Sequence, residues 1–163
     1  MLKIPENFSV EDRAERARNL FKSGYNCAQS VSLAFEDVIE ANYPIDRETI
    51  ISLTSGFGGG FGRLREVCGT VSGMTFLAGV ISPFNDPSDY SCKKENYTLV
   101  QKFAERFREE NGSIVCRELL GLRKAQKDSP VSTERTADFY KVRPCESLVV
   151  CAARIVAEHI ASL

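Results

Sequence analysis

Residues 55–79, SGFGGGFGRLREVCGTVSGMTFLAG, contain eight of the eleven glycines of the chain. Glycine permits positive φ and the close approach of another group, so Gly56–Gly62 predicts a tight hairpin or cradle. The nearly uncharged stretch that follows, from about Val67 to Ile81, predicts a buried helix at the centre of a bundle. Gly69 and Gly73 are four residues apart, which would let a neighbouring helix pack close to its backbone.

Two arginines lie between the glycine loop and a cysteine. Arg63 and Arg65 precede Cys68, which stands at the start of the predicted central helix. Nearby cations and a helix start favour the thiolate, which is the reactive and metal-binding form of cysteine. We therefore expect an activated thiol at Cys68, although a glycine-rich turn that leads into a buried helix explains the same residues without any chemistry.

The composition favours one helical domain, residues 1–163, with 43% hydrophobic and 26% charged residues. The net charge is −1 and no basic tract occurs, so we expect neither nucleic acid nor a membrane as partner. No segment approaches the roughly 18 apolar residues of a membrane span, and we expect a cytoplasmic protein. In a reducing cytosol six cysteines indicate redox chemistry, metal binding or simple packing.

Periodic apolar residues, caps and breaks predict an all-α fold, because strand signals are weak throughout. About six helices are expected, with a polar excursion or lid over residues 124–143 that includes one turn of helix at Thr136–Tyr140. The expected helices are Val10–Lys22 after the cap Ser9, Cys27 to the break at Asn42–Pro44, Asp46 to the glycine loop, Val67–Ile81, Ser91–Glu110, a short one capped by Ser113, and one from Pro144 to the C-terminal end.

Four cysteines fall in the first turn of a predicted helix: Cys27, Cys68, Cys116 and Cys145. The positive end of the helix dipole favours an anion there, a placement that low-pKa redox cysteines use. If these helix starts converge, the thiols form one partly buried cluster. Such a cluster could form reversible disulfides, or its four thiolates could ligate zinc or an iron–sulfur cluster. No C-x-x-C motif decides between these uses, and packing alone remains a third interpretation.

The glycines and cysteines resemble those of the C-GCAxxG-C-C family of redox-active proteins. The resemblance lies in residues 24–30, GYNCAQS, residues 55–60, SGFGGG, residues 66–73, EVCGTVSG, residues 116–121, CRELLG, and Cys145 ahead of Leu148 and Val149, and it spans about Val10 to Ala157. It implies a small, helical, redox-active protein that uses the four cysteines. The chain departs from the family pattern at Thr70, where alanine is usual, and we expect the extra hydroxyl to matter little.

The leading hypothesis is a thiol redox protein in which Cys68 or Cys27 attacks a disulfide and a neighbouring cysteine resolves the mixed species. Its partner would be a redox protein or a small thiol or disulfide, and no particular oligomeric state is indicated. The loop glycines Gly58, Gly59 and Gly60, with Arg63 and Arg65, could bind a small anion or a substrate carboxylate. Cys92 is expected to be an exposed bystander, and Cys151 to pack in the core.

Overall fold

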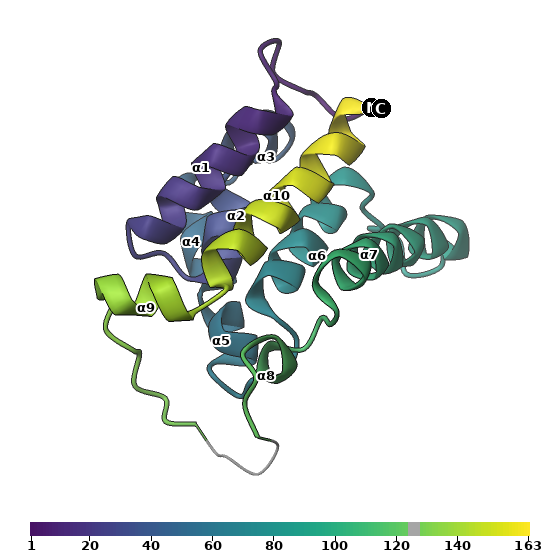
Figure 1. Cartoon of the computed structure of the whole chain (residues 1–163). Coiled ribbons are helices and arrows are strands. Elements are labelled where there is room, and N and C mark those ends of the chain that lie inside the picture. The colour runs from purple at the N-terminus through teal and green to yellow at the C-terminus, as the bar shows by residue number, and fades with distance from the viewer. Residues whose placement is uncertain (124–127) are drawn as a thin grey trace.

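The computed structural model describes residues 1–123 and 128–163, and every regular element in them is helical (Figure 1). The elements are α1 (Val10–Lys22), α2 (Cys27–Leu33), α3 (Glu36–Asn42), α4 (Arg47–Thr54), the 3₁₀ turn η1 (Ser55–Phe57), α5 (Gly58–Phe61), α6 (Gly69–Ile81), α7 (Tyr90–Asn111), α8 (Cys116–Leu119), α9 (Ala137–Val142) and α10 (Cys145–Ala161). Within these ranges the strand-like pairing is one antiparallel bridge between Val67 and Val115. The all-α prediction is confirmed.

Helix α6 packs along α2 at the centre of the bundle, and glycine makes this packing close. A Cβ atom at Gly73 would lie 2.9 Å from Cβ of Val31, and one at Gly69 would lie 3.1 Å from Cβ of Cys27. Contacts this short are rare between real side chains, so a larger residue would push the helices apart. The predicted role of the two glycines is therefore confirmed, and it brings the start of α2 against the start of α6.

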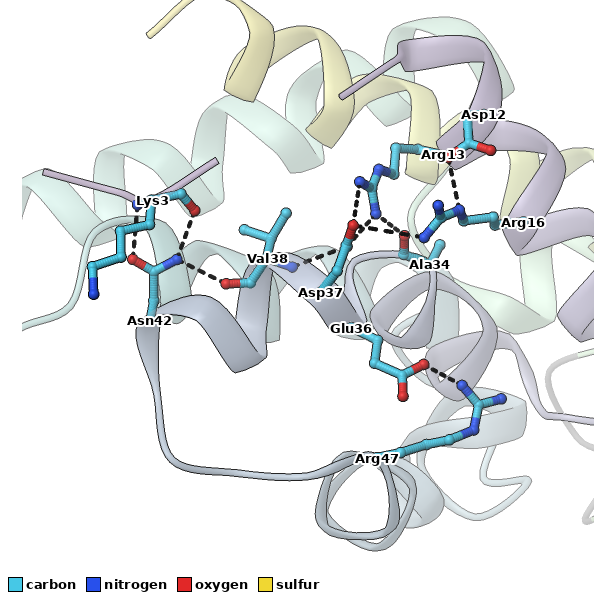
Figure 2. Close-up of polar contacts among 10 residues, drawn as sticks. All are labelled: Lys3, Asp12, Arg13, Arg16, Ala34, Glu36, Asp37, Val38, Asn42 and Arg47. Atoms are coloured by element: carbon cyan, nitrogen blue, oxygen red, sulfur yellow. Dashed lines mark hydrogen bonds and ion pairs between the residues drawn. The ribbon is translucent and has the colours of Figure 1, made fainter. Parts of the chain in front are cut away.

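The single helix expected from Cys27 to Asn42 is interrupted at Ala34 and Phe35, where φ of Phe35 is −117°. Arg13, only 1% exposed, donates from Nη1 to the carbonyl oxygen of Ala34 at 2.9 Å. Its guanidinium also pairs with both carboxylate oxygens of Asp37 (Figure 2). The break leaves a carbonyl group free for Arg13, a tertiary contact that local sequence patterns do not reveal.

Around this break, polar contacts tie α1, α3 and α4 together (Figure 2). Arg16 pairs with Asp12 at 2.7 Å and lies 3.7 Å from Asp37, and Arg47 pairs with Glu36. Burial alone raises the pKa of Asp37, but its hydrogen bonds and ion pair with Arg13 bring that pKa below the usual value. The carboxylate is therefore ionised at neutral pH and holds α3 against α1.

Most other predicted boundaries are close to those observed. Ser9 caps α1 by accepting from the Asp12 amide, and Gly112 ends α7 at a φ of +89°. The turn expected near Thr136 is the short helix α9, which Thr136 caps. Of the polar excursion expected over residues 124–143, residues 124–127 lie outside the described part of the chain.

Helix α10 packs mainly against α1, and both cover the central α2 and α6 pair. The starts of α6, α8 and α10 lie near α5 at the end of the bundle away from the C-terminus (Figure 1). No helix in the described ranges has the length and apolar character needed to cross a bilayer. Cys68, Cys116 and Cys145 stand at these three helix starts.

Candidate functional site

The glycine loop, predicted to be a tight hairpin or cradle, is a compact helical turn. It consists of η1 and α5, and Gly59 and Gly60 within α5 and Gly62 directly after it have φ between +57° and +69°. Arg63 and Arg65 also have positive φ, at 67° and 63°. Left-handed backbone costs a residue with a side chain roughly 1–2 kcal/mol, so surrounding contacts must hold both arginines in place.

Backbone pairing places Cys68 and Cys116 at diagonal positions across one antiparallel bridge. The amide of Cys68 donates to Ile114 oxygen at 2.8 Å, and the amide of Cys116 donates to Glu66 oxygen at 2.6 Å. These bonds flank the Val67–Val115 bridge and join the chain before α6 to the chain before α8. Ser113 accepts from the Val115 amide in the preceding turn instead of capping α8, and Cys116 is the first residue of that helix.

Gly60 lies directly beneath Cys116. A Cβ atom there would come within 2.8 Å of Cβ of Cys116 and 2.7 Å of the amide nitrogen of Glu66. The loop is thus packed against the Cys68 and Cys116 pair, which is why this position needs glycine. Gly60 is buried and absent from the pocket lining described below, whereas Gly58 and Gly59 do line that pocket.

Cys27 and Cys145 form a second pair nearer to solvent. Cys27 opens α2, whose start is fixed by a capping box: Asn26 accepts from the Gln29 amide at 2.9 Å, and Gln29 accepts from the Asn26 amide at 3.1 Å. Cys145 opens α10, directly after its cap Pro144. Both thiols are half-buried and line one pocket, whereas Cys68 and Cys116 are 4% and 7% exposed.

The two outer thiols have opposite pKa shifts. A hydrogen bond with Cys27 lowers the pKa of Cys145 to about 7, and the charges of Arg143, Arg135 and Arg65 lower it further against the effect of burial. The same hydrogen bond, with burial, raises the pKa of Cys27 well above its usual value. At neutral pH Cys27 therefore keeps its proton, while about half of Cys145 is thiolate.

The inner thiols are held in the protonated form. Burial raises the pKa of Cys68 to about 11, and burial raises the pKa of Cys116 although Arg65 donates to its sulfur at 3.7 Å. The expected activation of Cys68 by Arg63 and Arg65 is thus wrong, because neither arginine contacts it. The Thr70 hydroxyl, expected to matter little, lies 3.0 Å from the Cys68 sulfur and partly offsets the effect of burial on its pKa.

Arg63 and Arg65 both pair with one carboxylate, which cancels part of their charge. Arg63 Nη2 lies 3.1 Å from Asp128, and Arg65 Nε donates to the other oxygen of Asp128 at 2.6 Å. Arg63 also donates to the Ser129 carbonyl oxygen at 2.7 Å. The two arginines were expected to bind an anion, but they contact the segment that leads to α9. This segment lines the same pocket as Cys27 and Cys145.

Residues from four parts of the chain line a partly open pocket of about 250 Å³ in front of the outer thiols. Two of them, Arg135 and Arg143, were not singled out in the sequence, since both belong to a polar stretch without a regular period. The one signal was the position of Arg143, two residues before Cys145. The pocket is lined by Phe21, Asn26, Cys27, Ser55, Gly58, Gly59, Gly62, Arg63, Arg65, Pro130, Ser132, Thr133, Arg135, Phe139, Arg143 and Cys145.

The remaining cysteines lie apart from this pocket. Cys92 is half-buried near the start of α7, where its amide donates to Asp89 at 2.9 Å. Cys151 packs at the edge of the core, and its thiol donates to Glu110 at 3.2 Å. Among residues 1–123 and 128–163, no three His, Cys, Asp or Glu side chains are arranged to hold a metal ion. The zinc or iron–sulfur alternative for the four thiolates stays a prediction.

A family model described as "Putative redox-active protein (C_GCAxxG_C_C)" matches residues 25–159, and so spans all four cysteines of the two pairs. The matched region begins after α1, later than the start near Val10 indicated by the resemblance. No curated protein and no solved structure matches the chain.

Proposed function

The chain belongs to the C_GCAxxG_C_C family of redox-active proteins, and from this membership we propose that it performs thiol–disulfide exchange through Cys145 and Cys27. In this proposal Cys145 is the attacking thiolate and Cys27 the resolving cysteine. Cys68 and Cys116 stay reduced behind them, shielded from a bulky substrate by burial. The reaction would take place in a reducing compartment such as the cytoplasm.

The reaction balances with a disulfide as the oxidant. The Cys145 thiolate attacks one sulfur of the substrate disulfide, so that a bond from Cys145 to that sulfur forms and the substrate bond breaks. The first leaving thiolate takes the proton of Cys27. The Cys27 sulfur then attacks Cys145, which forms the Cys27–Cys145 disulfide and releases the second substrate thiolate. The substrate gains two electrons, and the protein dithiol loses two.

One observation carries the proposal: two thiols that are 118 positions apart in the chain line one pocket and shift each other's pKa in opposite directions, so that only Cys145 is acidified, to a pKa of about 7. An attacking thiol reacts fastest when its pKa is near the ambient pH, because it is then both ionised and nucleophilic. Its neighbour must keep its proton until the mixed disulfide forms. The raised pKa of Cys27 meets that requirement.

The test uses the reduced protein and bis(2-hydroxyethyl) disulfide, a neutral probe, with peptide mapping by mass spectrometry. The wild type is expected to form one intramolecular bond, between Cys27 and Cys145, with loss of two titratable thiols. Cys27→Ser should stop at a stable mixed disulfide on Cys145. Cys145→Ser should react at least about tenfold more slowly, since the remaining thiols are mostly protonated at pH 7.

Cys92→Ser and Cys151→Ser serve as matched controls, because both residues lie outside the pocket, and each should react at the wild-type rate. Circular dichroism checks that every variant keeps its helical content. A Cys68–Cys116 bond as the first product, or an unchanged rate in Cys145→Ser, would show that the outer pair is not the reactive one.

A further inference from the structure

We propose that the substrate is a small disulfide carrying carboxylate groups, and that Arg143 and Arg135 recognise those carboxylates beside Cys145. This inference rests on the proposed thiol–disulfide exchange and names the class of molecule that enters the pocket. It decides between the two partner classes that the sequence leaves open, a redox protein and a small disulfide.

The charged side chains that line the pocket all have the same sign. The charged residues that line it, within the described part of the chain, are four arginines, and none is a carboxylate. The overall charge of the protein is −1, so this concentration of positive charge is local. A concave site lined by one sign of charge concentrates ligands of the opposite sign. The pocket thus selects anions.

Two of these four arginine charges are available to a ligand. Asp128 pairs with both Arg63 and Arg65, so the charge of those two is partly cancelled inside the protein. Arg143 and Arg135 form no ion pair with any carboxylate among residues 1–123 and 128–163. The nearby carboxylate of Glu146 lies 3.5 Å from Arg18 and 3.6 Å from Lys22. Two guanidinium groups therefore keep their full charge next to the attacking sulfur.

Arg135 is held rigidly by uncharged groups. It donates to the carbonyl oxygens of Phe21 at 2.8 Å and Tyr25 at 3.1 Å. Its guanidinium also stacks over Phe21, at 4.2 Å from the ring centroid. Arg143 lies over the ring of Phe139 at 5.7 Å. Guanidinium groups fixed on aromatic rings lose little entropy when they bind a carboxylate, which is the ligand that their planar donors fit best.

The size of the pocket suits a small ligand. A volume of about 250 Å³ is at the small end of ligand pockets, which typically span about 300–1,000 Å³. It can hold one half of a low-molecular-weight disulfide with its carboxylate. The strap of residues 128–135, fixed by Arg63 and Arg65, contributes Pro130, Ser132 and Thr133 to the lining and restricts approach from that side. A disulfide within a folded protein would have to reach past this strap.

The experiment compares three probes of similar size and different charge. They are dithiodiglycolate, which is dianionic, bis(2-hydroxyethyl) disulfide, which is neutral, and cystamine, which is dicationic. Rate constants for the reduced protein are divided by those of 2-mercaptoethanol with the same probe, which removes intrinsic reactivity. The expected charge selectivity, anionic over neutral, is about tenfold or more at low salt and falls as ionic strength rises. Cystamine should be the slowest of the three.

Arg143→Gln is expected to lose most of this selectivity, and Arg143→Lys should retain part of it because the charge remains. The selectivity is a ratio within one variant, so a change in the reactivity of Cys145 cancels. The matched control is Arg154→Gln, on α10 but paired with Glu11 at 3.0 Å on the surface, and it should keep the wild-type ratio.

The outcomes separate the two proposals. A selectivity near one, with the neutral probe still giving the Cys27–Cys145 bond, would overturn the substrate class and leave the thiol exchange standing. The substrate class would also be overturned if the protein reduces insulin disulfides faster than dithiodiglycolate. Failure with all three probes would instead overturn the thiol exchange itself.

Discussion

Arginine does two different things at the two ends of this protein. At one end Arg13 is buried and pairs with Asp37, which sets the packing of α1 on α3 (Figure 2). At the other end Arg135 and Arg143 are half-buried, stacked on aromatic rings and without an ion pair in the described chain. The first arrangement uses the charge inside the fold, and the second leaves it available to a thiolate or a ligand.

The difference is visible in the groups whose pKa values these arginines shift. Arg13 lowers the pKa of Asp37, a carboxylate that would be ionised at neutral pH in any case. The hydrogen bond with Cys27, together with the charges of Arg143 and Arg135, lowers the pKa of Cys145, a thiol that would otherwise be protonated. Equivalent electrostatics therefore stabilises structure at one end and creates a reactive group at the other.

The largest expected effect is a loss of stability at the end of the molecule that contains Arg13 and Asp37. Arg13→Ala should lower the free energy of unfolding by about 4 kcal/mol, because it leaves a cavity and removes the main partner of the Asp37 carboxylate and the donor to the Ala34 carbonyl. Urea unfolding followed by circular dichroism measures this loss, and Arg13→Lys should lose less because a charge remains. Arg143→Ala is the comparison at the other end and should stay within about 1 kcal/mol of the wild type. Equal losses in Arg13→Ala and Arg143→Ala would remove the distinction drawn between the two ends.

A smaller effect tests whether the backbone of the thiol end is also structural. Gly60→Ala should cost about 3 kcal/mol, because the added methyl group meets Cys116 and the Glu66 amide at a φ of +69°. Gly62→Ala is the matched control: its φ is +57°, but no atom lies within 4 Å of the new Cβ atom, so about 1 kcal/mol is expected. Thermal unfolding of both variants gives the comparison. A similar loss in the two would mean that strain, and not contact with Cys116, requires glycine at position 60.

The smallest expected effect is a change in the reactivity of Cys145. In wild type, alkylation of Cys145 by iodoacetamide should rise with pH around a midpoint near 7. Arg143→Gln removes a cation, so the thiol pKa rises and alkylation at pH 7 slows by roughly two- to fivefold. The rate should recover at high pH, where the thiol ionises in both proteins.

The measurement is the modified fraction of the Cys145 peptide against time, by mass spectrometry. Arg154→Gln should leave the profile of this peptide unchanged, because Arg154 lies on the same helix away from the pocket. An Arg143→Gln profile that coincides with that of the wild type would show that this arginine does not act on the thiol.

Local patterns in the sequence predicted most helix starts. Ser9, Asn26, Asp46 and Thr136 each accept a hydrogen bond from an amide in the first turn of their helix, as their side chains indicate. Capping is a contact between residues two or three apart, so sequence alone contains the information for it. The break between α2 and α3 was missed, since it depends on Arg13, which is 21 residues away from Ala34.

The candidate site was predicted only in part. Sequence indicated the four cysteines at helix starts, but it assigned activation to Cys68 from the nearness of Arg63 and Arg65 in the chain. In the fold those two arginines pair with Asp128, more than 60 residues later, and the cations that contribute most to the low pKa of Cys145 are Arg143 and Arg135. Nearness in the chain therefore misidentified which cysteine is activated.

The sequence by itself determined the helical class, the caps, the need for glycine between the central helices and the identity of the four cysteines, because these follow from contacts over a few residues or from side-chain size. Only the tertiary structure decided how the cysteines pair, which thiol is acidic and which arginines remain unpaired. Those properties depend on burial and on charges that distant segments bring within a few ångströms, and the energy of such interactions varies steeply with distance and solvent exposure.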